Sequence, residues 1–138
     1  MYDWVREITK GADNIEVELL VDSGVDMHSY QPAAADIVKI ASCDLVIYVG
    51  GDSESWVEDV LKSTPAVDRS VLRLMDCLTD DMKICTDKHN HSDSESHLHE
   101  NTDKYDEHVW LSLINASVFC SDIYRKIVEI DPMSREQC

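Results

Sequence analysis

Apolar positions in the first third of the chain alternate between helical spacing and short strand-like runs. Residues 2–10 place apolar side chains on one helical face and predict an opening helix that Gly11 ends. Residues 16–21 predict a strand, and the polar stretch 22–31, which contains a glycine, predicts a loop. Pro32 suits the first turn of a second helix. The residues of that helix expected to face inward are Ile37, Ile40 and Ala41.

A nearly all-apolar run follows at residues 44–49 and ends at two glycines, residues 50–51. Such a run is typical of a strand that is buried on both faces of a parallel sheet. Ser55, with Glu58 three residues later, has the pattern of a capping box and predicts the start of a third helix. Its inward residues are expected to be Trp56, Val57, Val60 and Leu61. Residues 71–75 predict a further strand, so helices and strands alternate as in an α/β fold with a mostly parallel sheet.

Residues 86–108 interrupt this pattern, because they are dominated by His, Asp, Glu and Ser with almost no apolar residue. Such a composition predicts a solvated, mobile loop. Helical spacing then resumes and continues to Asp131-Pro132, which predicts a long amphipathic helix. Its apolar face is expected to contain Leu111, Ile114, Val118, Phe119, Ile123, Ile127 and Ile130.

Ligands of parallel sheets bind beyond the carboxyl ends of the strands, so His28 and the glycines at 50–51 lie where a site is expected.

Composition narrows the classes of function. The 138 residues suffice for one domain of ordinary size, and a hydrophobic content of 43% is typical of a folded chain. A net charge of -16 with only 12 scattered Lys and Arg residues argues against nucleic acid as a partner and favours cations. No apolar run approaches the roughly 18 residues that span a bilayer, and no signal peptide is recognisable. The five cysteines form no CxxC pair, which argues against a zinc finger.

Two histidines next to predicted ordered structure are candidate metal ligands. His28 lies in the sequence His-Ser-Tyr-Gln-Pro, and His108 lies in Asp-Glu-His-Val-Trp. Zinc is held by imidazole nitrogen, thiolate or carboxylate oxygen, and a transport site needs neutral ligands brought together from separate loops. Taken by themselves, both positions favour a plain surface histidine beside a packing Tyr or Trp, since single histidines are common in loops. A metal site and a plain surface histidine therefore both remain open on the residues alone.

The other four histidines form a cluster of a different kind. His89, His91, His97 and His99 lie among Asp, Glu and Ser residues, and five of the six histidines fall between residues 89 and 108. A solvated polar linker is the plain alternative, but it does not explain this concentration. We expect loose, secondary metal binding here, in many transient geometries.

Catalytic patterns are weak. Ser53 and Ser55 follow the two glycines, but there is no G-x-S-x-G elbow, and helix capping explains these serines better. The glycines also lack the spacing of a dinucleotide-binding or Walker loop. The adjacent carboxylates at 80–81 and 106–107 are expected to be solvated charge. No enzyme is predicted.

Four motifs in succession resemble those of the cluster A-I metal-binding lipoproteins, in particular the zinc-specific substrate-binding proteins of bacterial ABC importers. The motifs are Tyr2-Asp-Trp-Val, Val25-Asp-Met-His-Ser-Tyr-Gln-Pro32, Asp44-Leu-Val-Ile-Tyr-Val-Gly-Gly51 and Asp106-Glu-His-Val-Trp-Leu-Ser-Leu113. The last motif follows a His-rich acidic insertion, as it does in the zinc-specific members. The resemblance covers residues 2 to 132 and is more specific than any one motif.

The resemblance implies the N-terminal lobe of a two-lobed protein whose lobes are joined by a long helix, with zinc bound in the cleft. The lobe would be Rossmann-like, with His28 and His108 as zinc ligands and the His-rich loop as a secondary site that captures zinc. Its partner would be the membrane permease of the importer, and the parent protein would be extracytoplasmic and lipid-anchored. The expected division is an α/β body at 1–85, a His-rich loop at 86–107, a ligand loop with its helix at 108–132, and a tail at 133–138.

Two parts of the family pattern have no counterpart in these residues: the first strand of the sheet, and the second lobe with its own metal ligands. Without the strand, neighbouring backbone groups would be exposed, which predicts low stability, repacking, or pairing of two copies through the open sheet edge. Without the second lobe, His28 and His108 form a half-site, which is expected to bind zinc weakly unless other ligands complete it.

Two alternatives stay open. In the first, the chain is a metal-buffering or metal-chaperone protein and the His-rich loop is itself the site. In the second, which has less support, His108 and acidic neighbours hold a catalytic metal with an open water position, as in a hydrolase. Zn²⁺ is preferred to Mn²⁺ because imidazole suits zinc, whereas manganese sites usually contain more carboxylate.

Overall fold

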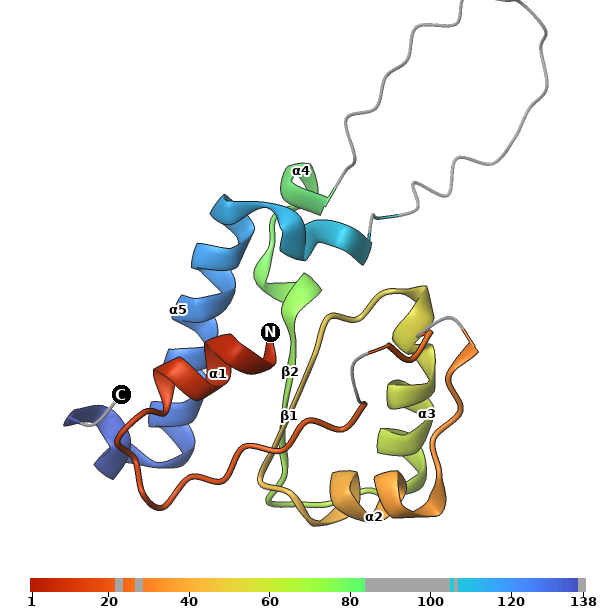
Figure 1. Cartoon of the computed structure of the whole chain (residues 1–138), viewed down its shortest axis with the longest axis horizontal. Helices are drawn as coiled ribbons and strands as arrows, with labels where there is room; N and C mark the ends of the chain where they lie inside the picture. The colour runs from red at the N-terminus through yellow and green to blue at the C-terminus, as the bar shows by residue number, and fades with distance from the viewer. Residues whose placement is uncertain (22–23, 27–28, 84–104, 106, 137–138) are drawn as a thin grey trace, which may run out of the picture.

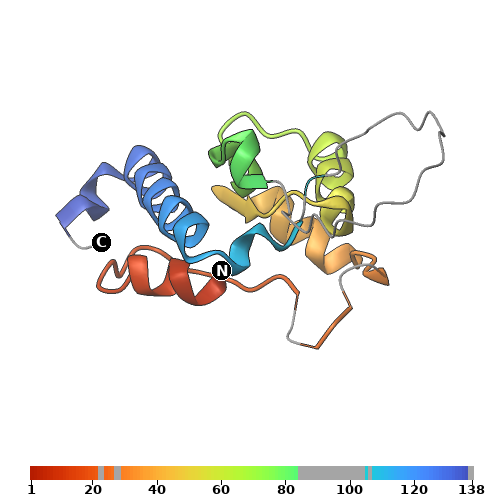
Figure 2. The ribbon, with the colours of Figure 1, turned by 90° about the horizontal axis from the view of Figure 1, so that it is seen from above.

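The computed structural model describes residues 1–21, 24–26, 29–83, 105 and 107–136. These residues form three layers, in which a small parallel sheet lies between α1 and α5 on one side and α2 and α3 on the other (Figures 1 and 2). The strands are β1 (Leu45–Tyr48) and β2 (Ser70–Arg73). The helices are α1 (Tyr2–Ile8), α2 (Ala34–Ser42), α3 (Ser55–Ser63), α4 (Asp80–Lys83) and α5 (Leu113–Ile130). Short 3₁₀ turns are η2 (Asp52–Glu54), η3 (Leu74–Cys77), η4 (Glu107–Leu111) and η5 (Pro132–Glu136).

The two strands pair in parallel, with Leu45 opposite Ser70 and Tyr48 opposite Arg73. Parallel neighbours need a crossover between them, and α3 forms this connection. The strand predicted at residues 44–49 is confirmed. The strand predicted at 71–75 begins one residue earlier and ends at Arg73, because the chain turns into η3 at that point.

The strand predicted at residues 16–21 is wrong: this segment has no strand structure. A strand forms only where a neighbouring backbone accepts and donates its ladder hydrogen bonds, and no backbone hydrogen bond joins 16–21 to the other residues described. Side chains hold the segment instead. Glu18 pairs with Lys39 of α2, and Asn14 donates a hydrogen bond of 2.6 Å to Asp131, which ends α5.

One stripe of α5 forms the core. Phe119 and Ile123 are fully buried and Ile127 is nearly so; because they are four residues apart, they lie one above another on the helix. They pack with Leu74 and Met75 of η3. Other residues of this cluster are Val49, Leu78 and Val109, with half-buried Trp4, Val5 and Ile8 from α1. The ring of Trp4 lies 6.5 Å from that of Phe119, so α1 closes this side of the core.

Three residues expected on the buried face of the last helix are exposed. Leu111 belongs to η4 rather than to α5, while Ile114 and Ile130 lie outside the buried stripe. Helical spacing by itself allowed several positions for the inward face. Contact with η3 selects the stripe through Phe119, and Ile114 is then turned to solvent.

The starts of α2 and α3 also differ from the prediction. Pro32 precedes α2, whose N-cap is Ala33, and Ala41 is exposed although Ile40 is buried. α3 has no capping box: its N-cap is Glu54, no side chain caps it, and Glu58 lies near Arg73 of β2 instead. The inward positions Val57 and Val60 are buried as predicted, whereas Trp56 and Leu61 are half-buried.

Replacing Phe119 by Ala is expected to lower the free energy of unfolding by about 3–5 kcal/mol, because it removes a fully buried ring from the centre of the core. Leu113→Ala is the matched control, since Leu113 on the same helix is 87% exposed and its loss should change stability by less than about 0.5 kcal/mol. Urea unfolding followed by circular dichroism measures both. Equal effects of the two changes would contradict this assignment of the core.

Candidate metal-binding site

His108 is the one predicted metal ligand that the structure describes. It lies in η4, where its backbone angles (φ -82°, ψ 17°) depart from helical values, and its side chain is exposed. The ring of Trp110 lies 6.4 Å away, while Val109 between them is buried. The side chain of Val109 therefore anchors the turn in the hydrophobic core, while the side chain of His108 stays accessible to solvent. The other predicted ligands, His28, His89, His91, His97 and His99, lie outside the described residues.

The described residues do not by themselves contain a complete metal site. Among them, no three His, Cys, Asp or Glu side chains are grouped so that they could hold a metal ion. The thiols of Cys77 and Cys43 are poor candidates, because burial raises the pKa of Cys77 to about 11 and also raises that of Cys43. Both therefore stay protonated at neutral pH, whereas zinc binds the thiolate.

Asn115 holds the turn that carries His108. Its side-chain amide donates hydrogen bonds to the carbonyl oxygens of Val109 (2.9 Å) and Met82 (3.3 Å), and the side chain is buried at the start of α5. Ser112 caps this helix by accepting a hydrogen bond from the backbone N–H of Asn115. Asn115 was not among the predicted site residues, although a polar residue four positions before Phe119, on the buried stripe, was a usable indication.

Asp36 organises the chain that follows His28. Its carboxylate accepts hydrogen bonds from the Tyr30 hydroxyl (2.7 Å) and from the backbone N–H of Ala33 (2.8 Å). The Tyr30 ring lies against Trp56 of α3, with ring centroids 5.0 Å apart. These contacts fix the backbone two residues beyond His28 in sequence. Asp36 was not among the predicted site residues, since its partner Tyr30 lies six residues before it and only the folded chain brings the two side chains together.

The same contacts shift two pKa values in opposite directions. Burial, and then the hydrogen bond to Asp36, raise the pKa of Tyr30 to about 12. The hydrogen bond from Tyr30, and then that from Ala33, hold the pKa of Asp36 below its ordinary value of 3.8. The interaction therefore favours a protonated phenol beside an ionised carboxylate.

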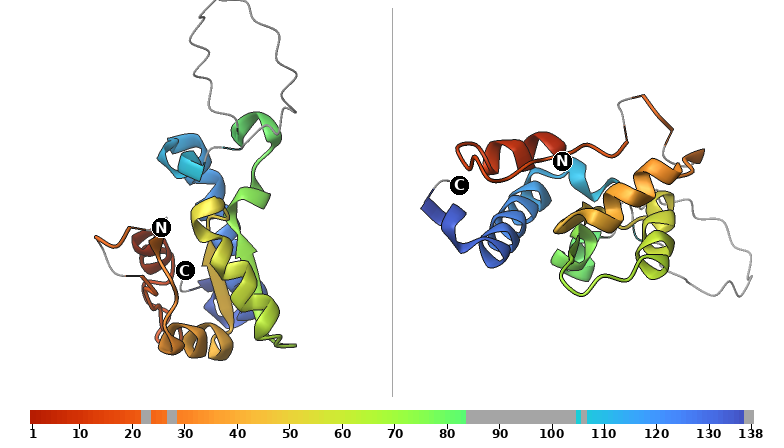
Figure 3. Two further views of the ribbon diagram at one scale, coloured as in Figure 1. Left: turned by 90° about the vertical axis from the view of Figure 1, so that its right-hand side faces the viewer. Right: turned by 90° about the horizontal axis from the view of Figure 1, so that it is seen from below.

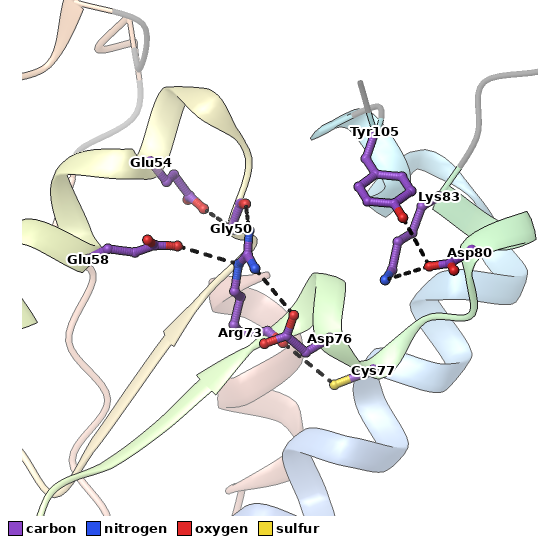
Figure 4. Close-up of polar contacts among 9 residues, drawn as sticks. All are labelled: Gly50, Glu54, Glu58, Arg73, Asp76, Cys77, Asp80, Lys83 and Tyr105. Atoms are coloured by element: carbon purple, nitrogen blue, oxygen red, sulfur yellow. Dashed lines mark hydrogen bonds and ion pairs between the residues drawn. The ribbon is translucent and has the colours of Figure 1, made fainter. Parts of the chain in front are cut away.

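Arg73 joins the two strands at their carboxyl ends (Figure 4). Its guanidinium donates a 2.6 Å hydrogen bond to the carbonyl oxygen of Gly50 and lies 3.7 Å from Glu58 and 3.3 Å from Asp76. Gly50 has φ +98°, and its N–H donates to the Glu54 carboxylate at 2.8 Å. A Cβ at Gly50 would lie 2.2 Å from Nε of Arg73, so both the backbone conformation and the space require glycine.

The loops at this edge of the sheet converge on one cavity of about 1240 Å³. His108 and Trp110 line it together with Ser53 and Glu54, which follow β1. A parallel α/β lobe with an exposed imidazole at the carboxyl ends of its strands has the geometry of a ligand-binding lobe.

The chain belongs to the family described as zinc-uptake complex component A, periplasmic, whose profile matches residues 1–138. It is 32% identical over 139 residues to the high-affinity zinc uptake system protein ZnuA of Bacillus subtilis, covering 99% of this chain and 41% of that protein. It is 30% identical over 122 residues to the zinc-binding lipoprotein AdcA of Streptococcus pneumoniae, covering 84% of this chain and 22% of that protein.

Solved structures show the same fold. The metal-dependent lipoprotein YcdH of Bacillus subtilis superposes with a TM-score of 0.74 at 27% identity, over 99% of this chain and 43% of that one. The Zn(II)-bound ZnuA-like domain of Streptococcus pneumoniae AdcA superposes with a TM-score of 0.70 at 24% identity, over 98% and 43%. The chain therefore spans less than half the length of these relatives. Within the described residues, no helix is both long and apolar enough to cross a membrane.

Asn115→Ala is expected to destabilise the protein by about 1–3 kcal/mol, because it removes the shorter of the two hydrogen bonds to the carbonyl oxygen of Val109 and leaves only the 3.4 Å bond from the backbone N–H of Ser112. Hydrogen exchange should also accelerate at the η4 amides that this contact holds. Ser117→Ala, an exposed change on the same helix, is the control and should leave both measurements unchanged. Unaltered exchange in η4 of the Asn115 variant would contradict the role assigned to Asn115.

Tyr30→Phe is expected to raise the pKa of Asp36 towards 3.8, because it removes the hydroxyl that stabilises the carboxylate. In the unmodified chain, the contribution of Asp36 to stability is present above pH 3.8 and is lost as the pH falls through its lowered folded-state pKa. The contribution of Tyr30 is present below pH 10 and is lost as the pH rises towards 12. NMR titration of the Asp36 carboxyl carbon checks the first shift, and no change in Tyr30→Phe would refute it.

Proposed function

We propose that this chain is the zinc-binding N-terminal lobe of the substrate-binding component of a metal ABC importer. The observation that carries the proposal is the position of His108. Its side chain is exposed on the η4 turn, which the buried Val109 anchors beside the carboxyl end of β1. The chain also matches the zinc-uptake family along its whole length. Such a component binds its ion outside the cytoplasm and delivers it to a membrane permease. The same membership favours a transport role over catalysis.

In this proposal, His28 and His108 bind zinc as neutral imidazoles. Each would bind through one ring nitrogen while the other donates to an oxygen that fixes the ring. His28 is two residues before Tyr30, which Asp36 and Trp56 hold in place. His108 is next to Val109, which Asn115 holds. Both ligands would thus be attached to backbone that is anchored by buried or hydrogen-bonded neighbours, which reduces the cost of ordering them on binding.

Two imidazoles leave a tetrahedral zinc with two open positions. In the proposed parent protein, the second lobe supplies the remaining ligands, consistent with relatives more than twice as long as this chain. This chain by itself would bind zinc with a half-site, completed by water, by a histidine of the His-rich segment or by another copy. Zn²⁺ is preferred to Mn²⁺ because both proposed ligands are imidazoles.

The His-rich segment 86–107 is proposed as a secondary site. With a net charge of -16, the chain attracts cations, and the paired histidines at 89, 91, 97 and 99 would raise the local zinc concentration near the site. If this segment were the main site, the protein would instead be a metal buffer or metal chaperone.

The parent protein is proposed to be lipid-anchored in the periplasm or at the cell surface, consistent with relatives named as lipoproteins.

Zinc titration by calorimetry separates these functions. The double variant His28→Ala/His108→Ala is expected to weaken the tightest binding phase by about tenfold or more while weak binding persists. The matched variant, with Ser at 89, 91, 97 and 99, keeps both proposed ligands. It should lose the weak phase and retain the tight one.

The opposite result, in which the four-serine variant loses all binding and the double variant binds normally, would replace the transport proposal with the metal-buffer one. Light scattering during the titration reports the mass of the zinc-bound species. A doubled mass that requires His108 would mean that a second copy completes the coordination.

A further inference from the structure

A polar cluster joins α4 to the residue that leads into η4. The hydroxyl of Tyr105 donates a hydrogen bond of 3.1 Å to the carboxylate of Asp80, and Nζ of Lys83 lies 3.3 Å from the same oxygen. The ammonium of Lys83 also lies over the Tyr105 ring, 5.0 Å from its centroid, which is a cation–π contact. Figure 4 shows these three side chains converging, and we call them the Tyr105 clasp.

The clasp differs from an ordinary surface ion pair, because its cation is largely buried. The side chain of Lys83 is only 14% exposed, whereas that of Asp80 is 77% exposed. Ion pairs between two exposed side chains contribute little to stability. A buried ammonium, in contrast, loses contact with water and needs other groups to replace it. The Asp80 carboxylate and the Tyr105 ring supply this replacement, so loss of the ring removes one of these two groups.

The clasp connects parts of the chain that are distant in sequence. Tyr105 is 25 residues after Asp80, and closing a loop of that length has an entropic cost that contacts between its ends must offset. Asn115 adds a second connection, because its amide donates to the carbonyl oxygens of Met82 in α4 and Val109 in η4. Figures 1 and 3 (left) show α4 beside η4, at the end of the lobe where α5 starts. The helix α4 is therefore a support for η4.

His108 lies between these two connections. Tyr105 is three residues before it, and Val109 directly follows it. The backbone angles of His108 (φ -82°, ψ 17°) depart from helical values. The direction of its side chain is therefore set by the anchored residues on either side and not by a regular helix.

We infer that Tyr105 is a positioning residue for His108. The clasp fixes the chain before His108, Asn115 fixes the chain after it, and the two together hold the imidazole in one place. A ligand that is already ordered loses less conformational freedom on binding, which strengthens binding. Tyr105 acts through the backbone of η4 and takes no part in coordination. The effect on zinc rests on the proposed function, whereas the effect on the turn does not depend on metal.

Hydrogen exchange of the metal-free chain, followed by NMR, tests the hold on the turn. Tyr105→Ala is expected to accelerate exchange at the η4 amides by about threefold or more, since both contacts of its side chain are lost. The midpoint of thermal unfolding should move by less than about 3 °C, because Tyr105 is 43% exposed and lies outside the core. This difference separates a local hold on η4 from a general loss of stability.

The lysine of the clasp provides a matched pair of variants. Lys83→Met removes the cation and should also accelerate η4 exchange, whereas Lys83→Arg keeps a cation for Asp80 and the ring and should restore the slower rate. Lys62→Met is the control, because Lys62 pairs with Asp59 three residues before it, as Lys83 does with Asp80, but is 72% exposed. It should leave η4 exchange unchanged.

Zinc calorimetry tests the consequence for binding. Tyr105→Ala is expected to weaken the tightest phase by about three- to tenfold and to have no effect once His108 is replaced by Ala. Tyr105→Phe should give a smaller loss, because its ring stays against Lys83. An effect of Tyr105→Ala that persists in the His108→Ala background would overturn the inference, since Tyr105 would then act on zinc without His108.

The two measurements separate this inference from the proposed function. If His108→Ala leaves zinc binding unchanged, the proposed function fails, and the exchange rates of the metal-free chain still decide whether Tyr105 holds the turn. Unchanged η4 exchange in Tyr105→Ala would overturn the inference whatever the zinc titration shows.

Discussion

The parallel pairing of β1 with β2 is the constraint on which the rest of this lobe depends. Parallel strands need a crossover and cover on both faces, which α3 supplies together with α2 on one side and α5 with α1 on the other. Pairing in parallel also brings both carboxyl ends to one edge. The Gly50 turn, the Arg73 side chain and the His108 turn gather there, so the position of the candidate site follows from the direction of the strands.

Three polar side chains fix irregular backbone in this lobe, and two of them, Arg73 and Asn115, act near that edge. Arg73 holds the carbonyl of Gly50, Asn115 holds that of Val109, and Asp36 holds Tyr30 and the start of α2. Turns have few backbone partners of their own, so such side chains decide how precisely a turn is placed. The imidazole of His108 is exposed, and its backbone is held in place because the next residue, Val109, is buried and accepts a hydrogen bond from Asn115.

The candidate metal site borders a cavity that runs along β1, since His108 and Trp110 line it together with Leu45 and Ile47. His108 and Trp110 line one part of this cavity, and the apolar residues of β1 line another. The relatives ZnuA and YcdH are more than twice as long as this chain.

The sequence by itself determined the alternation of helices and strands and the bounds of the two paired strands to within two residues. It also determined that His108 lies in a short segment just before the last long helix. Apolar spacing carries that information locally. It could not determine that the backbone of residues 16–21 makes no ladder hydrogen bonds with the other described residues. Nor could it determine that Glu58 forms an ion pair with Arg73 instead of capping a helix, or that Ile114 is exposed while Phe119 is buried in the core. Only the tertiary structure decided these, because a hydrogen bond or a buried surface needs its partner, and the partners here are distant in sequence.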